Sequence, residues 1–271
     1  MYKSKPNFII VGVMKGSTSA AAVNLNKHPD IFCLTPYWKE KVNTYYNIDV
    51  SSMSGGLGET NSKELDFFNI ESNYNLGIDF YKQYFPRPLK VQGEASPNYF
   101  PADETSNEVV NRMYAHLPNA KIIILLRDPI TRAYSHWNMI QTINPSWGSR
   151  FYGLDFNSAT ELKLINNNIL ERSTYLQNLK LYREVFGSSN VYVTLQELIA
   201  TNPIEEYNKI YEFLGVNTLG SDPGYRDSFV SSYSNSIDSQ SKTWLRNYFS
   251  SDVNGVKELY PDLNYSHWDT Y

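Results

Sequence analysis

Hydrophobic and polar residues are arranged along the chain in a pattern that predicts strands alternating with helices. Three short segments are apolar on both faces, as expected of central strands in a parallel sheet: residues 8–11, 121–126 and 190–195. Five other segments carry apolar residues at helical spacing: residues 20–27, 107–116, 129–141, 171–186 and 205–214. This alternation predicts the α/β class, with a central parallel sheet that is flanked by helices.

Two segments lack this pattern. Residues 51–64 are rich in Ser and Gly, and residues 218–241 are rich in Ser, Asp and Tyr with little periodicity. Both are expected to be long surface loops, and long loops in a compact domain are often lids or binding loops. Because the sequence shows no repeat, heptad pattern or linker, we expect residues 1–271 to form a single domain.

The composition restricts the classes of function. The chain has 24 Lys and Arg against 28 Asp and Glu, and this net charge of −4 argues against binding nucleic acid through bulk charge. Cys33 is the only cysteine, which excludes an intrachain disulfide and a cysteine-based zinc cluster. The apolar runs are too short to span a membrane and no signal peptide follows Met1, so a soluble, cytoplasmic protein is expected.

The turn after the first strand has the features of an anion-binding site. Gly12 and Gly16 bracket this turn, and Lys15 adds a positive charge beside the start of the next helix. Three residues with hydroxyl groups follow: Ser17, Thr18 and Ser19. The first N–H groups of a helix lack intrahelical partners and the helix dipole is positive there, while Gly16 would let a phosphate approach the backbone. The alternative is a glycine turn that only connects the strand to the helix.

This turn differs from the phosphate loop of nucleoside triphosphatases. In that loop the lysine follows the second glycine, whereas Lys15 precedes Gly16. The sequence also offers no clear aspartate at the end of a later strand as a magnesium ligand. No metal site is predicted, because His116 and His267 have no acidic or cysteine companions at ligand spacing.

A second candidate site follows the strand at residues 121–126. Arg127 leaves the carboxyl end of that strand, where ligands bind in open α/β sheets, and Ser135 lies about two turns into the next helix. A guanidinium group together with a hydroxyl suits a terminal phosphate. The alternatives are an ion pair of Arg127 with Asp128 or another carboxylate, and a helix contact for Ser135.

With both sites in this order, the sequence resembles the sulfotransferases that use 3′-phosphoadenosine-5′-phosphosulfate (PAPS). The resemblance runs from residue 7 to about 216 and is to the glycosaminoglycan (heparan sulfate) branch and its bacterial relatives. It includes the loop at residues 8–18 and the Arg127–Ser135 pair. Four segments between them also match: residues 28–30, 39–40, 77–81 and 94–100.

The resemblance implies a P-loop-like three-layer fold and a role for each matching residue. The amides of residues 15–18 and the hydroxyls of Ser17, Thr18 and Ser19 would hold the 5′-phosphate, and Lys15 would stabilise the leaving group. Arg127 and Ser135 would hold the 3′-phosphate. Glu40 would be the general base, and Tyr175 would face the cofactor or, alternatively, only pack a helix onto the sheet. The product would be adenosine 3′,5′-bisphosphate, with no metal required.

The sequence departs from the glycosaminoglycan branch in three places. The segment after Glu40 is about one residue longer, which leaves the register between Glu40 and Lys41 open. Ala95 stands where a lysine is common, and the usual Lys-Gly-Arg run near the C-terminus is absent. These losses of positive charge argue against a highly sulfated polysaccharide, so the expected acceptor is a carbohydrate or other small molecule with a hydroxyl or, alternatively, an amine.

Two histidines near these motifs are expected to be structural. His28 precedes Pro29 at a helix end, where it can cap carbonyl groups. His136 could be a base, but it lies about 100° around the helix from Ser135, so a surface or helix contact is favoured. Two other functions stay open: a nucleotide-dependent kinase, and a non-catalytic protein that binds a glycan or a partner on the same fold.

Overall fold

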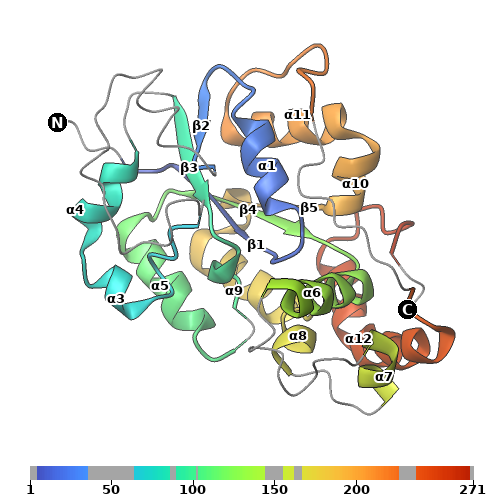
Figure 1. Ribbon diagram of the computed structural model, residues 1–271. Helices are drawn as coiled ribbons and strands as arrows, with labels where there is room; N and C mark the ends of the chain where they lie inside the picture. Colours follow the sequence, from blue (N-terminus) through green and yellow to red (C-terminus); the bar gives the residue numbers. More distant parts are fainter. Residues whose placement is uncertain are drawn as a thin grey trace.

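A central five-stranded sheet organises the protein, and all of its strands are parallel. The computed structural model describes residues 5–35, 64–85, 90–101, 103–143, 155–161, 167–225 and 236–268. The strand order is β2-β3-β1-β4-β5 (Figure 1). The strands are β1 (Phe8–Gly12), β2 (Ile31–Cys33), β3 (Val91–Ala95), β4 (Lys121–Leu126) and β5 (Val191–Leu195).

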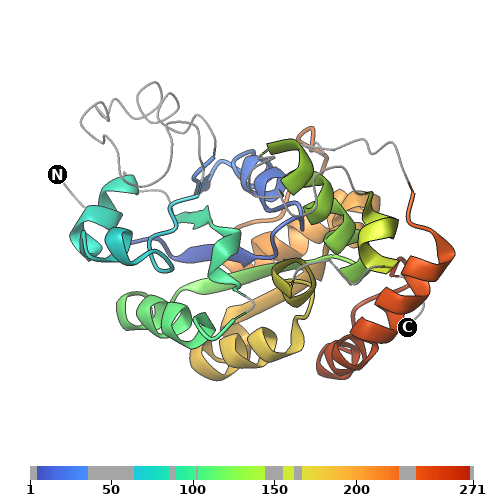
Figure 2. The same cartoon turned by 60° about the horizontal axis from the view of Figure 1, so that its bottom comes forward.

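Helices cover both faces of the sheet, as predicted. On one face are α1 (Thr18–Leu25), α10 (Gln196–Thr201) and α11 (Pro203–Leu214). On the other are α5 (Ser106–His116), α6 (Pro129–Ile143), α9 (Leu176–Phe186) and α12 (Ser239–Leu259). Figure 2 shows the sheet between α1 on one side and α5, α9 and α12 on the other. This three-layer arrangement confirms the predicted fold class.

The core explains why the three predicted strands could be recognised. In β1, Ile9 and Val11 contribute to the core beneath α5 and α9, while Phe8 and Ile10 pack beneath α1 and α11. A strand that is buried on both faces needs apolar residues at consecutive positions. β3 was not predicted because Gln92 and Glu94 interrupt its apolar pattern, although both side chains are buried.

The helix predicted over residues 171–186 begins later in the structure, at Leu176, and the predicted start is the last residue of another short helix. α8 (Asn167–Glu171) ends before a turn at residues 172–175, and α9 begins after it. Ser173 Oγ donates to the Ile169 carbonyl, and Thr174 Oγ1 donates to the Glu171 carbonyl at 2.7 Å. Such side-chain bonds compete with the helical ladder, and they end the helix here.

The prediction of a loop over residues 218–241 is wrong at its end, because α12 begins at Ser239. Asp238 is the N-cap and accepts a hydrogen bond from the Ser241 N–H at 2.7 Å. Leu245, Phe249 and Val253 lie on one buried face at four-residue spacing. Residues 226–235 of this segment and residues 51–63 of the other predicted loop lie outside the described residues.

Short helices complete the described structure: α3 (Glu71–Tyr74), α4 (Ile78–Tyr81), α7 (Phe156–Glu161) and the 3-10 turns η1 (Lys82–Tyr84), η2 (Pro97–Tyr99) and η3 (Ser188–Asn190). No helix in the described ranges combines the length and apolar character needed to cross a membrane.

The strand order identifies the edge where a ligand is expected. From β1 the chain moves through α1 towards β2, and from β4 it moves in the opposite direction to β5. The carboxyl ends of β1 and β4 therefore flank a topological switch point, which is the usual ligand position in open α/β sheets. The turn at residues 13–17 and Arg127 follow these two strand ends.

Candidate active site

The turn between β1 and α1 is held against the neighbouring strand β4. The Val13 N–H donates to the Leu125 carbonyl at 3.0 Å, and the Gly16 N–H donates to the Val13 carbonyl at 2.8 Å. Lys15 and Ser17 both have left-handed backbones, with φ of 70° and 64°. Non-glycine residues in this conformation concentrate at functional sites, because the surrounding structure must compensate for their strain.

Gly16 also has a packing role in this turn. A Cβ at this position would lie 2.4 Å from the Leu125 carbonyl oxygen and 3.0 Å from the Val13 carbonyl oxygen. The missing side chain therefore allows the turn to pack on β4, and the Gly16 N–H closes the turn. The N–H groups left for an anion are those at the start of α1, where the helix offers them no intrahelical partner.

The first turn of α1 presents hydroxyl groups and positive potential. Ser17 is the N-cap, but its side chain makes no capping hydrogen bond, and no acidic residue lies in the first turn. Ser17 and Ser19 are half-buried, whereas Thr18 is buried. A helix start with these features can bind a phosphate or sulfate group.

Arg127 connects the two predicted anion sites. Its Nη1 donates to the Lys15 carbonyl at 3.1 Å, across 112 positions of sequence, and its Nε donates to Thr131 Oγ1 at 3.2 Å. The nearby Asp128 carboxylate accepts the Thr131 N–H at 2.8 Å, at the start of α6. Among the described residues no carboxylate lies within ion-pair distance of Arg127, so the structure does not support the alternative of an ion pair.

Ser135 lies one turn of α6 beyond Thr131, on the same face of the helix. Thr131 itself receives the hydrogen bond from Arg127. The Ser135 side chain is buried, at 1% exposure. The helix thus carries Ser135 on the side that faces the Arg127 loop, beneath the surface.

Arg132 was not singled out in the sequence, yet its fully buried side chain joins three parts of this region. It donates to the Met14 carbonyl at 3.3 Å, to Ser173 Oγ at 2.6 Å and to the Ile169 carbonyl. Burial lowers the pKa of Arg132 to about 10, so the group stays charged at neutral pH. We call Lys15, Arg127, Arg132 and Arg172 the cationic junction; Arg172 donates to Asn98 Oδ1 at 3.2 Å.

The pKa of His136 is affected by the positive charges of the cationic junction. The His136 side chain is buried, at 5% exposure. The predicted alternative of a surface position is therefore wrong, and the burial agrees with the alternative of a helix contact. Burial, followed by the charges of Arg132, Arg172 and Lys15, lowers the pKa of His136 to about 3. His136 is therefore neutral near pH 7 and a weak base. His28, as expected, contacts a loop: its Nε2 lies 2.9 Å from the Asn217 carbonyl.

Tyr175 contacts the loop that carries Arg127. Its side chain is fully buried, and its hydroxyl donates to the Arg127 carbonyl at 2.8 Å. Burial raises the pKa of this hydroxyl well above its ordinary value. The complete burial agrees with the alternative of a packing role, the hydrogen bond connects Tyr175 to Arg127, and the contact with the cofactor stays a prediction.

A buried carboxyl group at the end of β3 also escaped the sequence analysis. Glu94 has 0% exposure and accepts hydrogen bonds from Tyr81 at 2.6 Å, Ser96 at 2.7 Å and Tyr99 at 3.0 Å. Burial raises its pKa to about 7, against the opposing effect of these donors. We call these four residues the Glu94 cluster. It also holds the chain at residues 65–67, because Ser96 Oγ accepts the Leu65 N–H and the Tyr99 hydroxyl accepts the Phe67 N–H.

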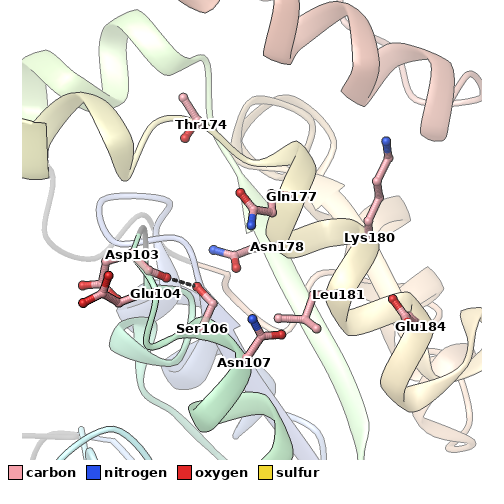
Figure 3. A pocket seen from close by; sticks show the side chains of 10 residues that line it. All are labelled: Asp103, Glu104, Ser106, Asn107, Thr174, Gln177, Asn178, Lys180, Leu181 and Glu184. Carbon is pink, nitrogen blue, oxygen red and sulfur yellow. Dashed lines mark hydrogen bonds between the residues drawn. The ribbon is translucent and has the colours of Figure 1, made fainter.

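A cavity of about 510 Å³ lies between the start of α5 and α9 (Figure 3). Its lining is polar and includes carboxylates, amides and one ammonium group, among them Asp103, Asn178 and Lys180. None of the predicted donor-site residues lines it, so the switch point and this cavity are separate features. The predicted base Glu40 and the neighbouring Lys41 lie outside the described residues.

The fold and these contacts define an α/β protein in which the two predicted anion-binding motifs meet at a switch point of the sheet. The class follows from comparison with known sequences: the model of the sulfotransferase family matches residues 6–219. The chain therefore belongs to the sulfotransferase family.

Two human proteins show the similarity in sequence. The chain is 28% identical over 220 residues to bifunctional heparan sulfate N-deacetylase/N-sulfotransferase 3 from Homo sapiens, covering 78% of this chain and 22% of the relative. It is 25% identical over 221 residues to heparan sulfate glucosamine 3-O-sulfotransferase 5 from Homo sapiens, covering 78% and 54%. The chain thus spans about a fifth and about half of the length of these relatives.

A solved structure resembles the whole chain. The crystal structure of a sulfotransferase from Alicyclobacillus acidocaldarius aligns with a TM-score of 0.62 and 26% identity, covering 98% of both chains. The fold therefore agrees with the family found from the sequence.

Proposed function

We propose that this protein transfers the sulfonate group of PAPS to a hydroxyl, or alternatively an amine, of a carbohydrate or small-metabolite acceptor. The observation that carries the proposal is the hydrogen bond from Arg127 Nη1 to the Lys15 carbonyl at 3.1 Å. This hydrogen bond brings the two proposed anion-binding motifs together at the switch point of the sheet. A nucleotide with phosphate groups at both its 3′ and 5′ positions needs two such motifs close to each other.

The donor set suits this nucleotide. The start of α1 offers N–H groups and the hydroxyls of Ser17 and Ser19 to the 5′-phosphate, and Arg127 with Ser135 would take the 3′-phosphate. The cationic side chains of this site and the dipole of α1 complement an anion. Arg127 has no carboxylate partner among the described residues. PAPS supplies an activated sulfonate when it is bound. Lys15 would stabilise the negative charge that develops on the departing phosphate, without a metal ion.

Glu40 is the proposed general base, which would accept the proton of the acceptor hydroxyl. The two human relatives carry heparan sulfate in their names, which supports a carbohydrate acceptor. Ala95 argues against an acceptor that is densely sulfated, since it replaces a lysine common in that branch. We also propose that residues 1–271 form one domain.

A titration of the purified protein tests the donor assignment. We expect adenosine 3′,5′-bisphosphate to bind more tightly than ATP, because ATP lacks the 3′-phosphate that Arg127 would bind. Arg127→Gln should remove this preference. Arg112→Gln is the matched control, since Arg112 on α5 pairs with Glu71 on α3 and with Glu108 on α5, and lies away from the switch point. Tighter binding of ATP by the natural protein would favour a kinase and overturn the proposal.

A second experiment separates an enzyme from a binding protein on the same fold. Acceptor saccharides are screened with labelled PAPS, and Glu40→Gln is compared with the natural protein. We expect this variant to lose most turnover while it binds adenosine 3′,5′-bisphosphate normally. Lys41→Ala is the control, because the sequence leaves open whether residue 40 or residue 41 occupies the position of the base. Unchanged turnover in Glu40→Gln would remove Glu40 from the mechanism.

A further inference from the structure

The peptide group that joins Arg127 to Asp128 is held at both of its polar atoms. The Arg127 carbonyl accepts the Tyr175 hydroxyl at 2.8 Å. The Asp128 N–H donates to Glu197 Oε1 at 2.8 Å. Both polar atoms of one peptide group are thereby bound, so this group cannot rotate without breaking one of the two hydrogen bonds.

Both partners of this peptide group are themselves held by the C-terminal part of the chain. Asp252 on α12 accepts the N–H groups of Tyr175 at 2.7 Å and of Leu176 at 3.0 Å. Glu197 accepts the indole N–H of Trp268 at 3.2 Å through its second oxygen. The Trp268 ring also packs on Tyr175, with ring centroids 6.3 Å apart. Two half-buried carboxylates therefore connect α12 and the segment after it to the Arg127 loop.

These carboxylates orient Arg127 without neutralising it. Each of them accepts N–H groups, and neither lies within ion-pair distance of the Arg127 guanidinium. The guanidinium instead contacts the Lys15 carbonyl and Thr131. An arrangement that fixes the backbone of an arginine and leaves its charge available is suited to a bound anion.

We infer that Asp252 and Glu197 are positioning residues for the 3′-phosphate of the nucleotide, acting through the Arg127–Asp128 peptide group. The inference rests on the proposed function, because that function assigns the 3′-phosphate to Arg127. α12 and residues 260–268 thus contribute to donor recognition although the family match ends at residue 219.

The test measures how much the 3′-phosphate contributes to binding. Dissociation constants for adenosine 3′,5′-bisphosphate and adenosine 5′-monophosphate are determined by calorimetry for the natural protein and for Asp252→Asn and Glu197→Gln. The natural protein should prefer the bisphosphate. Each variant should reduce that preference about tenfold, with the affinity for the monophosphate unchanged. Glu258→Gln, which changes an exposed carboxylate on the same helix, is the control and should keep the full preference.

Tyr175→Phe provides a second variant in case Asp252→Asn does not fold. It removes only the hydroxyl that donates to the Arg127 carbonyl, and it should reduce the same preference. A full preference in the folded variants would overturn the positioning role while leaving the proposed function intact. An equal loss of affinity for both nucleotides would also overturn it, since that result indicates a general structural effect. A natural protein with no preference for the bisphosphate would overturn the proposed function itself.

Discussion

Two polar regions at the carboxyl edge of the sheet differ in how their charges are satisfied. In the cationic junction, Arg127 donates to the Lys15 carbonyl and Arg132 donates to the Met14 carbonyl. These backbone carbonyl groups have no formal charge. In the Glu94 cluster, three hydroxyl groups surround one carboxyl group and complete its hydrogen bonds. In the first region two guanidinium groups thus meet neutral acceptors, whereas in the second the carboxyl group is satisfied within the protein.

The comparison separates polar residues that prepare a site from polar residues that support it. Burial alone does not distinguish them, because Arg132 and Glu94 are both fully buried. The neighbouring charges do distinguish them: after burial, the cations Arg132, Arg172 and Lys15 also lower the pKa of His136, whereas hydroxyl groups surround the Glu94 carboxyl group. An anion would be attracted to the junction and would gain nothing at the Glu94 cluster.

The largest expected effect comes from Lys15. Lys15→Ala should reduce sulfonate transfer about 100-fold to 1,000-fold, the range seen when one group that stabilises developing charge is removed. The free energy of unfolding of the Lys15→Ala variant should stay close to that of the natural protein. Activity with labelled PAPS and chemical denaturation are measured side by side. Lys27→Ala serves as the control, and equal activity of the two variants would separate Lys15 from the chemistry.

A pH series tests the Glu94 cluster. In the folded protein Glu94 keeps its proton up to about pH 7, whereas in the unfolded chain it releases the proton near pH 4.5. Between these values the folded state binds more protons, so the free energy of unfolding should fall as the pH rises, by roughly 3 kcal/mol in total. Glu94→Gln should flatten this part of the curve, as measured by denaturation from pH 4 to pH 8. Parallel curves for the two proteins would contradict the assignment.

Gly16→Ala sharpens the comparison by disturbing only the turn. The added Cβ would lie 2.4 Å from the Leu125 carbonyl oxygen, so the turn must move away from β4. We expect a loss of about 1–3 kcal/mol in the free energy of unfolding, as for other overpacked positions. Nucleotide affinity should fall as well. Gly220→Ala, where no atom lies within 4 Å of the added group, should change neither quantity.

The smallest effect is expected for Ser135. Ser135→Ala removes one hydroxyl from the side of α6 that faces the Arg127 loop, and the bisphosphate should bind about tenfold more weakly, near the lower end of what one hydrogen bond to a charged group contributes. Calorimetry with the bisphosphate and the monophosphate measures the change. A loss that is equal for both nucleotides would place Ser135 in packing.

The sequence predicted the parts of the site that depend on local pattern. The apolar residues of β1 and β4 identified central strands, and the positions of Lys15 and Arg127 at their carboxyl ends followed from chain order. β3 was missed because polar residues, Gln92 and Glu94, occupy buried positions in it: the Gln92 side chain donates to the Lys5 carbonyl, and Glu94 accepts from three hydroxyl groups that only the folded chain brings around it. Glu40 remains a prediction, since it lies outside the described residues.

By itself, the sequence determined the α/β class and the two anion-binding motifs, because strand burial, helix starts and residue types are local properties. Only the tertiary structure decided that the Lys15 carbonyl meets the Arg127 guanidinium, that Gly16 packs on β4, and that Asp252 and Glu197 hold the Arg127 loop. These contacts join residues that lie 69 to 112 positions apart in the chain, and they form only because the strand order brings those residues together. No local pattern encodes which carbonyl a distant side chain will reach.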